Sequence, residues 1–443
     1  MNKAELFLNK HIYSRFFKRA DAQLVANNTV WIIIDRLIRI ALGMLTGVWV
    51  ARYLGPIDFG KLTYVNSFVI LFTPITNFSI DSLVVRDLAQ SPDRKNEILG
   101  SGFLLKILAS IFGFVAAIVI INFLNPDDAE MLWMVFILGS CFFFQAFDII
   151  DLYFQSVLKS KYPAYVRTVV FVLLSVVKII LILNHAPLSA FVWSYFAEIG
   201  LGCIGLIAIY AQKQAFFIFW RASWRQIKSY VNNSLIMILQ SFALVSQTKL
   251  DQIIVGQFVS ENDLGQYSVA MRMVDMVLFL PMAIYASYAP KIAEAKLKNE
   301  DIYQSKLANL FSLLVWISIV LAVLMLIFGQ WGIQFLFGQS YIFAGVLFSF
   351  SGIRLVAAFT VVAKSVYYVN ENLLKHSLFC LLAGAIVNIT TSCLLIPKIG
   401  TIGAIWANIF GFIVSMLIVD LFAEKTRKQL FFYLKSLLKF TRK

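Results

Sequence analysis

Charged side chains are scarce in this sequence of 443 residues. Only 14% of the residues are Asp, Glu, Lys or Arg, whereas a soluble globular chain has about 25%. The apolar fraction of 60% and the 41 phenylalanines leave too little polar surface for a water-soluble fold or a disordered chain. The composition therefore excludes both classes over most of the chain and predicts an all-α polytopic membrane protein.

Cysteine and histidine are also rare, with 4 and 3 residues. The cysteines fall inside apolar segments without CxxC spacing, and the histidines are far apart near segment ends. These residues are Cys141, Cys203, Cys380, Cys393, His11, His185 and His376. We therefore expect no metal site, no disulfide framework and no cofactor.

Long polar segments are absent too, which excludes a nucleotide-binding or glycosyltransferase domain. Residues 55–62 (GPIDFGKL) are close to the phosphate-binding pattern GxxxxGK[ST], but Leu62 replaces the hydroxyl that binds magnesium and no soluble strand precedes the loop. The short outward loops argue against a membrane-embedded polymerase or ligase, which needs a substantial outward loop with acid and base residues. The sequence thus predicts a carrier and not an enzyme, driven by an ion gradient or by the substrate gradient.

Twelve stretches are long and apolar enough to cross a bilayer as helices. They lie at residues 29–50, 62–81, 98–122, 131–152, 164–183, 188–210, 231–255, 267–289, 307–328, 341–362, 376–396 and 401–423. Residues 1–27 lack the apolar core of a secretory signal, and their interleaved apolar and basic residues predict an interfacial amphipathic helix.

The basic residues are distributed unevenly between the two sides of these predicted spans. Of the 38 Lys and Arg, 28 fall on the side of the two termini, 7 fall inside spans, and only Arg52, Lys61 and Lys398 fall on the other side. This asymmetry places both termini in the cytoplasm. It also explains the net charge of +14 without nucleic acid. The basic tail, residues 424–443, either serves only as a topology determinant or also attracts anionic lipid headgroups.

An internal repeat with an offset of about 205 residues relates the two halves of the chain. The matching residues are Asn28 with Asn233, Asp58 with Asp263, Gly60 with Gly265 and Pro74 with Pro281. The alternative is chance similarity between two short turns. The repeat predicts a six-helix lobe at 28–210, an inter-lobe loop at 211–229 and a second six-helix lobe at 230–423, related by pseudo-two-fold symmetry around a central cavity.

Several cations lie deep within the predicted spans, where an ionisable group costs several kcal/mol unless it is paired or hydrated. They are Arg36, Arg39, Lys106 and Arg354. If they line the cavity, they make it cationic and suited to an anionic ligand such as a phosphate or pyrophosphate. The alternative is that they form salt bridges between helices.

A second set of residues is predicted to couple transport to proton or sodium entry, or to pair with the cations. It consists of Asp35, Glu198, Asp251, Arg272 and Asp275. Asp35 lies one helical turn before Arg39, and Arg272 lies three residues before Asp275, so each pair shares a helical face. Near span ends, snorkelling toward water is the simpler interpretation. Pro74 and Pro281 are candidate hinges, although prolines are frequent in membrane helices.

Distinctive motifs lie in the first hundred residues and around residues 245–290. They include Asn28, Trp31, Asp35, Arg36, Arg39, Phe59, Gly60 and Tyr64, together with residues 51–56 (ARYLGP), 81–88 (DSLVVRDL), 97–100 (EILG), 249–252 (KLDQ) and 264–267 (LGQY). These motifs resemble those of bacterial polysaccharide repeat-unit flippases. These flippases belong to the superfamily that also contains multidrug and toxin extruders and lipid II flippases.

This resemblance implies a bacterial inner-membrane protein that moves an undecaprenyl-pyrophosphate-linked oligosaccharide from the cytoplasmic to the periplasmic leaflet. It also implies contact with the polymerase and chain-length machinery of polysaccharide and O-antigen synthesis. The alternative within the superfamily is an ion-coupled multidrug exporter. Such an exporter is expected to have a cavity dominated by carboxylates and aromatic residues.

Overall fold

The computed structural model describes residues 3–213 and 220–440. Within these ranges, the side chains of residues 3–34, 36, 374, 434, 436 and 438–440 lie outside the description. The backbone of the predicted amphipathic segment 1–27 is described as helix from residue 3, whereas its side chains, the side chain of Arg36 and part of the predicted loop 211–229 fall outside the description. The lobe boundaries stay a prediction.

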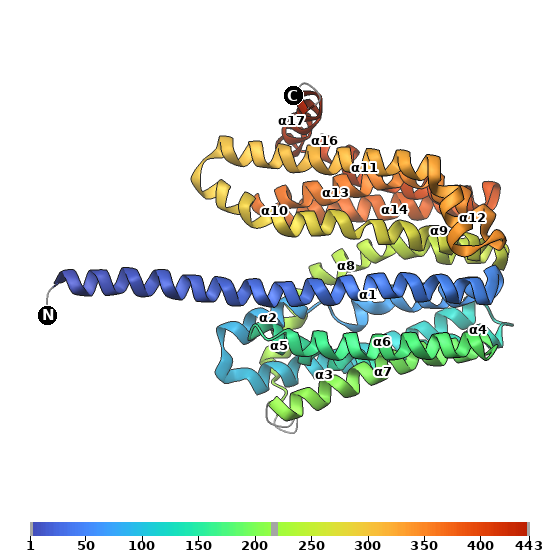
Figure 1. The fold of residues 1–443 in the computed structure, drawn as a ribbon, viewed down its shortest axis with the longest axis horizontal. Helices are drawn as coiled ribbons and strands as arrows, with labels where there is room; N and C mark the ends of the chain where they lie inside the picture. Colours follow the sequence, from blue (N-terminus) through green and yellow to red (C-terminus); the bar gives the residue numbers. More distant parts are fainter. Residues whose placement is uncertain (1–2, 214–219, 441–443) are drawn as a thin grey trace. The chain divides into compact units, whose positions relative to one another are not determined.

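Throughout the described ranges, every regular element is a helix. The chain divides into two compact units that interleave along the sequence (Figure 1). Unit 1 falls within Met1–Gly47, Ile75–Ala116 and Phe136–Ser234, and unit 2 within Val48–Pro74, Ala117–Val135 and Leu235–Lys443.

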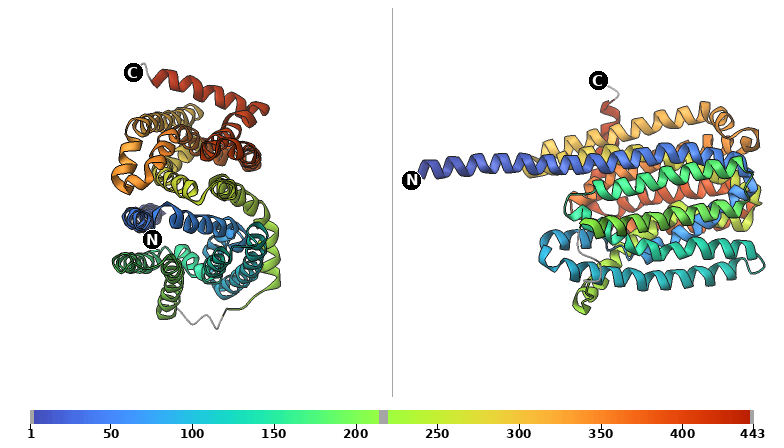
Figure 2. Two further views of the ribbon diagram at one scale, coloured as in Figure 1. Left: turned by 90° about the vertical axis from the view of Figure 1, so that its right-hand side faces the viewer. Right: turned by 60° about the horizontal axis from the view of Figure 1, so that its bottom comes forward.

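Unit 1 is built from the helices of the first half of the chain. They are the first part of α1 (Lys3–Thr76), α2 (Asp81–Gln90), η1 (Pro92–Arg94), most of α3 (Lys95–Leu124), the end of α4 (Ala129–Gln145), η2 (Ala146–Asp148), α5 (Ile149–Ser156), α6 (Lys161–Leu183), α7 (Leu188–Lys213) and the start of α8 (Trp224–Phe258). In Figure 2, α6 and α7 run side by side. Only 22% of the apolar window of each is buried, as expected of helices that face lipid.

Unit 2 combines the end of α1, the adjoining ends of α3 and α4, and the rest of α8 with the second half of the chain. The further helices are α9 (Glu261–Val277), α10 (Phe279–Lys298), α11 (Glu300–Phe337), η4 (Gln339–Tyr341), α12 (Ile342–Phe350), α13 (Gly352–Asn370), α14 (Leu374–Ile399), α15 (Thr401–Ile413), the π-helical turn η5 (Val414–Ile418), α16 (Val419–Phe422) and α17 (Glu424–Phe440).

Helices α14 and α15 approach each other closely because glycine lies at their contact. A Cβ atom on Gly384 would lie 2.7 Å from the carbonyl oxygen of Gly411, and one on Gly411 would lie 2.8 Å from the Cβ of Asn388. Small residues permit this approach between membrane helices, where apolar side chains gain little from leaving lipid. The crossing brings polar residues of both helices toward α8 within unit 2.

Ten helical stretches of the described chain are long and apolar enough to cross a membrane. Three of them are much longer than the roughly 20 residues that one crossing requires. Leu37–Gln90 spans 54 residues, and Glu261–Lys298 and Glu300–Phe337 span 38 each. The first is interrupted at Gly55, whose φ of 71° and ψ of 176° suit only glycine, so the chain changes direction there between two predicted spans.

The two repeat glycines lie against each other within unit 2, although 205 positions separate them in the sequence. A Cβ atom on Gly60 would lie 2.6 Å from the carbonyl oxygen of Glu261, and one on Gly265 would lie 1.9 Å from the carbonyl oxygen of Pro56. Neither position has room for a methyl group, which explains why each copy of the repeat carries glycine there. Lys61 lies beside this contact and pairs with Glu130 at 2.9 Å.

Candidate functional site

Unit 1 contains a cluster of ion pairs formed by α1, α5 and α6. Arg39 donates to Asp35 at 2.7 Å, one turn earlier on α1, and the other carboxylate oxygen of Asp35 accepts from the hydroxyl of Thr168 at 2.8 Å. On α6, Arg167 pairs with Asp148 at 3.1 Å and with Asp151 at 2.9 Å. Two arginines and three carboxylates therefore lie within a few contacts of one another.

These residues line a polar pocket of about 260 Å³. Its walls include Asp35, Arg39, Asp151 and Arg167, together with Gln155 and Ser160. Asp35 is buried, whereas the side chain of Arg39 is 34% exposed. The Nε atom of Arg39 has no hydrogen-bond partner among the described residues. The pocket therefore presents arginine donors to a ligand, although its own carboxylates compete for them.

Two other predicted residues of unit 1 form separate ion pairs. Lys106 on α3 is 1% exposed and contacts Asp81, at the start of α2, at 2.8 Å. Glu198 on α7 accepts from Lys178 on α6 at 2.7 Å, and the ammonium of Lys178 also lies 4.1 Å from the ring centroid of Tyr195. These contacts are of the kind that stabilises packed membrane helices. The predicted role of Lys106 in ligand binding stays a prediction.

In unit 2, Asp275 on α9 lies between two cations. Its Oδ2 atom accepts from Lys249 of α8 at 3.0 Å, and its Oδ1 atom lies 4.0 Å from Arg354 of α13. Arg272, one turn earlier on α9, places its guanidinium 6.0 Å from the ring centroid of Phe59. The described contacts of Asp275 are therefore with cations of other helices.

Arg354 is almost completely buried, with 1% of its surface exposed. One guanidinium nitrogen lies 2.8 Å from the sulfur of Met271, and the group lies 6.0 Å from the ring centroid of Phe412. Its Nε and Nη2 atoms have no hydrogen-bond partner among the described residues. Unsatisfied buried donors of a charged group are costly, so Arg354 has donors available for an anionic acceptor.

Asp251, on α8, lies in a dense group of polar side chains in unit 2. It is 0% exposed, and its Oδ2 atom accepts from the hydroxyl of Tyr267 at 2.5 Å and from Asn408 at 3.1 Å. The backbone N–H of Gln252 donates to Oδ1 at 2.8 Å. Two further buried oxygens, Oε1 of Gln247 and Oδ1 of Asn408, have no hydrogen-bond partner in the described part of the chain. A buried carboxylate with spare amide oxygens nearby has the chemistry of a site for a hard cation or a proton.

The two predicted hinge prolines each lie next to a helix break. Pro74 lies two residues before the end of α1 at Thr76, and Phe78 and Ser79 in the following turn have positive φ angles of 53° and 47°. Pro281 lies in the first turn of α10, just after Leu278 separates α9 from α10. Both prolines therefore lie next to an interruption of the helix, which is a left-handed turn after Pro74 and a single residue before α10 at Pro281. Motion at these sites stays a prediction.

Sequence reasoning did not single out Arg167. It lies in the second turn of α6, where a basic residue is ordinarily interpreted as snorkelling toward water. Its role depends on α5, which brings Asp148 and Asp151 to it across the chain reversal at residues 157–160. Asp148 and Asp151, three residues apart, indicate a cluster of carboxylates in the sequence. Their spacing does not show that Arg167 is the cation that pairs with them.

Comparison with known families places most of the chain in one of them. Residues 49–346 match the model of a family described as polysaccharide biosynthesis protein. A search of curated proteins finds no match. Among solved structures, the fold is similar to an inward-facing multidrug resistance MATE family transporter of the MOP superfamily. That alignment has a TM-score of 0.70 and 13% identity, and it covers 90% of this chain and 99% of the other.

Two other structures show the same fold. The lipid II flippase MurJ in an inward closed conformation matches with a TM-score of 0.70 and 16% identity over 92% of this chain and 91% of the other. A MOP superfamily transporter from Pyrococcus furiosus matches with a TM-score of 0.62 and 13% identity over 92% and 96%. The predicted fold class, an all-α polytopic membrane protein of the two-lobed transporter type, is confirmed.

Proposed function

The chain belongs to the family of polysaccharide biosynthesis proteins, and from this premise we propose that it moves an undecaprenyl-pyrophosphate-linked oligosaccharide across the bacterial inner membrane. In this proposal the headgroup passes from the cytoplasmic to the periplasmic leaflet by alternating access, with both termini in the cytoplasm. Membership in the family supports a saccharide-containing substrate. The similarity of the fold to a transporter and a flippase supports transport as the activity. The protein then acts as a carrier and not as an enzyme.

The observation that carries the proposal is the presence of arginine donors in polar or unsatisfied surroundings in both units. In unit 1, Arg39 and Arg167 face one pocket, and in unit 2 Arg354 has two nitrogens without acceptors in the described structure. A pyrophosphate offers several acceptor oxygens and more negative charge than a single carboxylate. It is therefore suited to replace Asp35 and Asp151 as the partner of the two arginines of unit 1.

Alternating access requires a place that closes the path toward the periplasm. Within unit 2, residues on the predicted periplasmic side form a tight contact between the two repeat copies, where Gly60 and Gly265 exclude a side chain. Lys61 strengthens this contact through Glu130 at 2.9 Å and Glu261 at 3.6 Å. We place the periplasmic gate here, because a headgroup that leaves on this side requires these contacts to separate.

Ion coupling is assigned to Asp251. Its complete burial and the spare oxygens of Gln247 and Asn408 favour the binding of a proton or a sodium ion at this carboxylate. Asp251, on α8, and Tyr267, on α9, flank the gate residues Glu261 and Gly265 in the sequence, which suits a site whose occupancy changes with gating. Loss of transport in Asp251→Asn, together with loss of its dependence on the ion gradients, is the expected result in sealed vesicles. Transport that is unchanged when both gradients are collapsed would remove the coupling.

The second candidate function is an ion-coupled multidrug exporter. The observation in its favour is the TM-score of 0.70 with the MATE family transporter, which equals the score with the lipid II flippase. A drug cation requires accessible carboxylates that are not neutralised. In the pocket of unit 1 the carboxylates are instead paired with Arg39 and Arg167, which disfavours this function.

Deletion of the gene separates the two functions. The leaflet that holds the lipid-linked oligosaccharide is determined in spheroplasts with a membrane-impermeant glycosidase, and surface polysaccharide and sensitivity to cationic drugs are scored in the same cells. The proposal predicts accumulation on the cytoplasmic face and loss of surface polysaccharide, both restored by the wild-type gene. Normal delivery to the periplasm with increased drug sensitivity would replace it with the exporter.

A further inference from the structure

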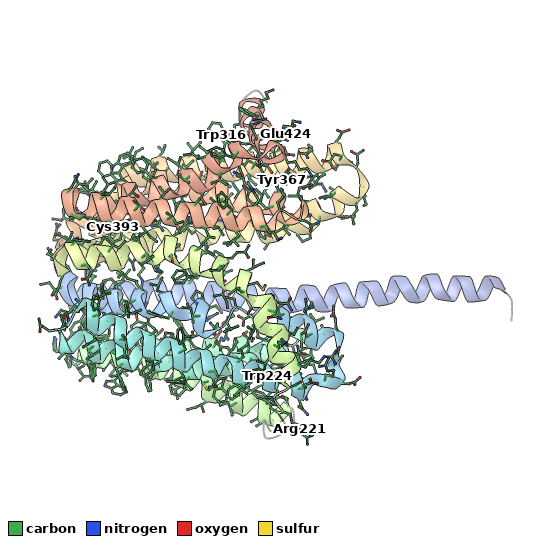
Figure 3. The ribbon with its side chains drawn as sticks, turned by 180° about the vertical axis from the view of Figure 1, so that it is seen from behind. Arg221, Trp224, Trp316, Tyr367, Cys393 and Glu424 are labelled. Carbon is green, nitrogen blue, oxygen red and sulfur yellow. The ribbon has the colours of Figure 1, made fainter. Side chains whose placement is uncertain are left out.

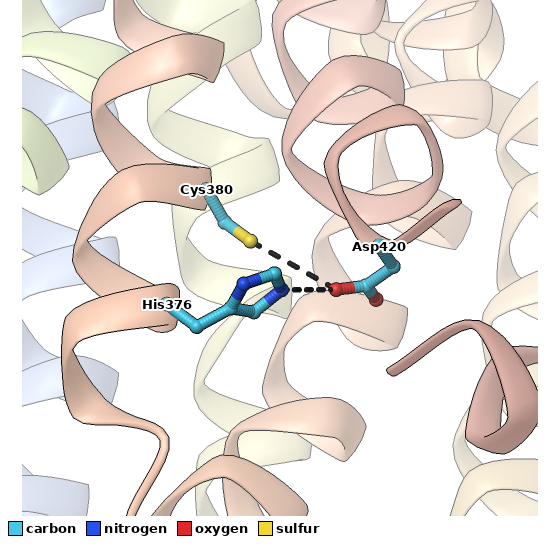
Figure 4. Close-up of side chains that lie close together, drawn as sticks. All are labelled: His376, Cys380 and Asp420. Carbon is cyan, nitrogen blue, oxygen red and sulfur yellow. Dashed lines mark hydrogen bonds and ion pairs between the residues drawn. The ribbon is translucent and has the colours of Figure 1, made fainter. Parts of the chain in front are cut away.

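Three side chains with metal-binding chemistry meet in unit 2, outside the site described above (Figure 4). They are His376 and Cys380 from α14 and Asp420 from α16, and one ligand atom from each lies within 4.8 Å of the others. The Oδ1 atom of Asp420 lies 2.8 Å from Nε2 of His376 and 3.9 Å from Sγ of Cys380. Both side chains of α14 therefore point at the same carboxylate oxygen.

The local structure explains how this cluster forms. His376 and Cys380 are four residues apart on one helix, so they project from the same face, as paired ligands on helical metal sites do. Asp420 lies two residues after the π-helical turn Val414–Ile418, which adds a residue to the turn and changes the direction of the side chains after it. Such turns are frequent at functional sites, and here the turn aims a carboxylate at α14.

The two oxygens of Asp420 have different partners. Oδ1 faces His376 and Cys380, whereas Oδ2 accepts from the ammonium of Lys364, which also donates to the carbonyl oxygen of Met416. The hydroxyl of Tyr368 lies 2.8 Å from Oδ1 and 2.9 Å from Oδ2, and its ring packs edge-on against His376 with a centroid distance of 5.7 Å. A cation on the Oδ1 side therefore leaves Lys364 in place as a partner that orients the carboxylate.

The cluster also has access to open space. Cys380, Lys364 and Tyr368 line a cavity of about 300 Å³ in unit 2, whose other walls are mostly apolar. Asp420 is only 1% exposed and Cys380 3%, whereas the side chain of His376 is 17% exposed, and the cavity provides an entry path and room for a fourth ligand. Three protein ligands with one open position are the arrangement of zinc sites that exchange a water or a substrate group.

We propose that His376, Cys380 and Asp420 bind one divalent transition metal ion, with Zn²⁺ as the ion that best suits a nitrogen, a sulfur and an oxygen ligand. Binding removes the proton of the Cys380 thiol to water and leaves His376 neutral, so the thiolate and the Asp420 carboxylate offset two of the three positive charges of the ion and the Lys364 ammonium. The ion ties α14 to α16 on the predicted cytoplasmic side. From the sequence alone, we expect no metal site. The three ligands form no recognisable sequence motif, because Asp420 and His376 are 44 residues apart.

Cobalt binding to the purified full-length protein tests the site without any measurement of transport. The protein is treated with a chelator in detergent and titrated with Co²⁺, and the thiolate-to-cobalt charge-transfer band is recorded in the near ultraviolet. We expect one equivalent of Co²⁺ with this band, and its displacement by Zn²⁺. In Cys380→Ser the band is lost, and in Asp420→Asn the affinity falls at least tenfold. Tyr368→Phe, which removes only an outer partner, lowers the affinity by about tenfold.

Cys393 provides a matched control, because it lies farther along the same helix and is exposed (Figure 3). Cys393→Ser is expected to keep the band and the stoichiometry of the wild type. Zn²⁺ is also expected to raise the melting temperature of the wild type and of Cys393→Ser, but not of Cys380→Ser. Absence of the band from the folded wild-type protein, or its persistence in Cys380→Ser, would overturn the proposal. Neither result affects the proposed transport function.

Discussion

Three arginines on membrane helices differ in their surroundings between the two units. They are Arg39 and Arg167 in unit 1 and Arg354 in unit 2. The unit 1 arginines have carboxylate partners within 3.1 Å and border a polar pocket. Arg354 is 1% exposed, has a carboxylate no closer than 4.0 Å, and contacts a methionine sulfur and a phenylalanine ring. Unit 1 thus pairs the charge of each of these arginines with a carboxylate, whereas unit 2 leaves the charge of Arg354 underpaired.

The comparison indicates that Arg354 is the arginine whose buried charge most requires a ligand as its partner. A buried guanidinium without acceptors destabilises the fold, so its presence is best explained by a ligand that pairs with it during transport. A well-paired arginine at a pocket costs less in the resting protein but must exchange partners when the ligand binds. We therefore expect the substitution of Arg354 in unit 2 to lower transport strongly without a loss of stability. Substitutions of the paired arginines in unit 1 should lower transport less.

The largest effect is expected from Arg354→Met. Methionine fills a similar volume beside Met271 and Phe412 without a buried charge, and Asp275 keeps Lys249 as its partner. The free energy of unfolding should therefore stay within about 1 kcal/mol of the wild type or rise. Transport in proteoliposomes should fall about a hundredfold, which corresponds to about 2.7 kcal/mol. Full transport would show that Arg354 has no role in ligand binding.

A smaller effect is expected when either arginine of the unit 1 pocket is removed. Arg39→Ala and Arg167→Ala should each lower the transport rate about tenfold, because the remaining arginine still binds the anion. The double variant should lose more than the product of the two single effects, since the residues share one ligand. A double-mutant cycle in proteoliposomes measures this coupling. Strictly additive losses would mean that the two arginines act on different partners.

Asp35→Asn should strengthen ligand binding, whereas the arginine substitutions weaken it. The substitution removes the carboxylate that competes with the ligand for Arg39 and keeps the shape of the side chain. Because this ion pair is partly exposed, we expect a gain of about 1 kcal/mol, or roughly fivefold tighter binding of a pyrophosphate-lipid analogue. Calorimetry with the purified protein measures the affinity, and Asp93→Asn on the exposed surface serves as the control. Weaker binding would mean that Asp35 itself contacts the ligand.

The smallest effect is expected from Lys298→Ala on α10. Its partner Glu294 lies 2.5 Å away, but both side chains are more than 60% exposed, at 68% and 63%. Such surface pairs contribute less than about 1 kcal/mol. Transport and melting temperature should match the wild type, so this variant defines the baseline for the other substitutions. A clear loss of transport here would show that the assay responds to surface charge in general.

The sequence predicts the helical fold and some local geometry because these depend on composition and short-range spacing. The apolar spans predict membrane helices, and the i, i+4 spacing of Asp35 and Arg39 puts both on one face, where the structure has them in contact. The repeat identified Gly60 and Gly265 as matching positions, but not that these glycines pack against each other.

The rest of the site depends on tertiary contacts that spacing does not encode. Arg167 meets Asp148 and Asp151 only because α5 and α6 fold back on each other. Asp420 contacts His376 and Cys380 only because a π-helical turn precedes it, and no residue pattern in the sequence predicts that turn. Likewise, the depth of Arg354 within a span does not reveal that its donors lack acceptors.

Translocation by the purified protein tests the central claim most directly. The protein is reconstituted in sealed liposomes that carry a fluorescent undecaprenyl-pyrophosphate oligosaccharide in the inner leaflet, and an external glycosidase reports each headgroup that crosses. We expect rapid loss of protected substrate with the wild type and with Lys298→Ala, and a rate near that of empty liposomes with Arg354→Met. A wild-type rate equal to that of empty liposomes, in vesicles supplied with proton and sodium gradients, would contradict the claim that this protein is an oligosaccharide-lipid flippase.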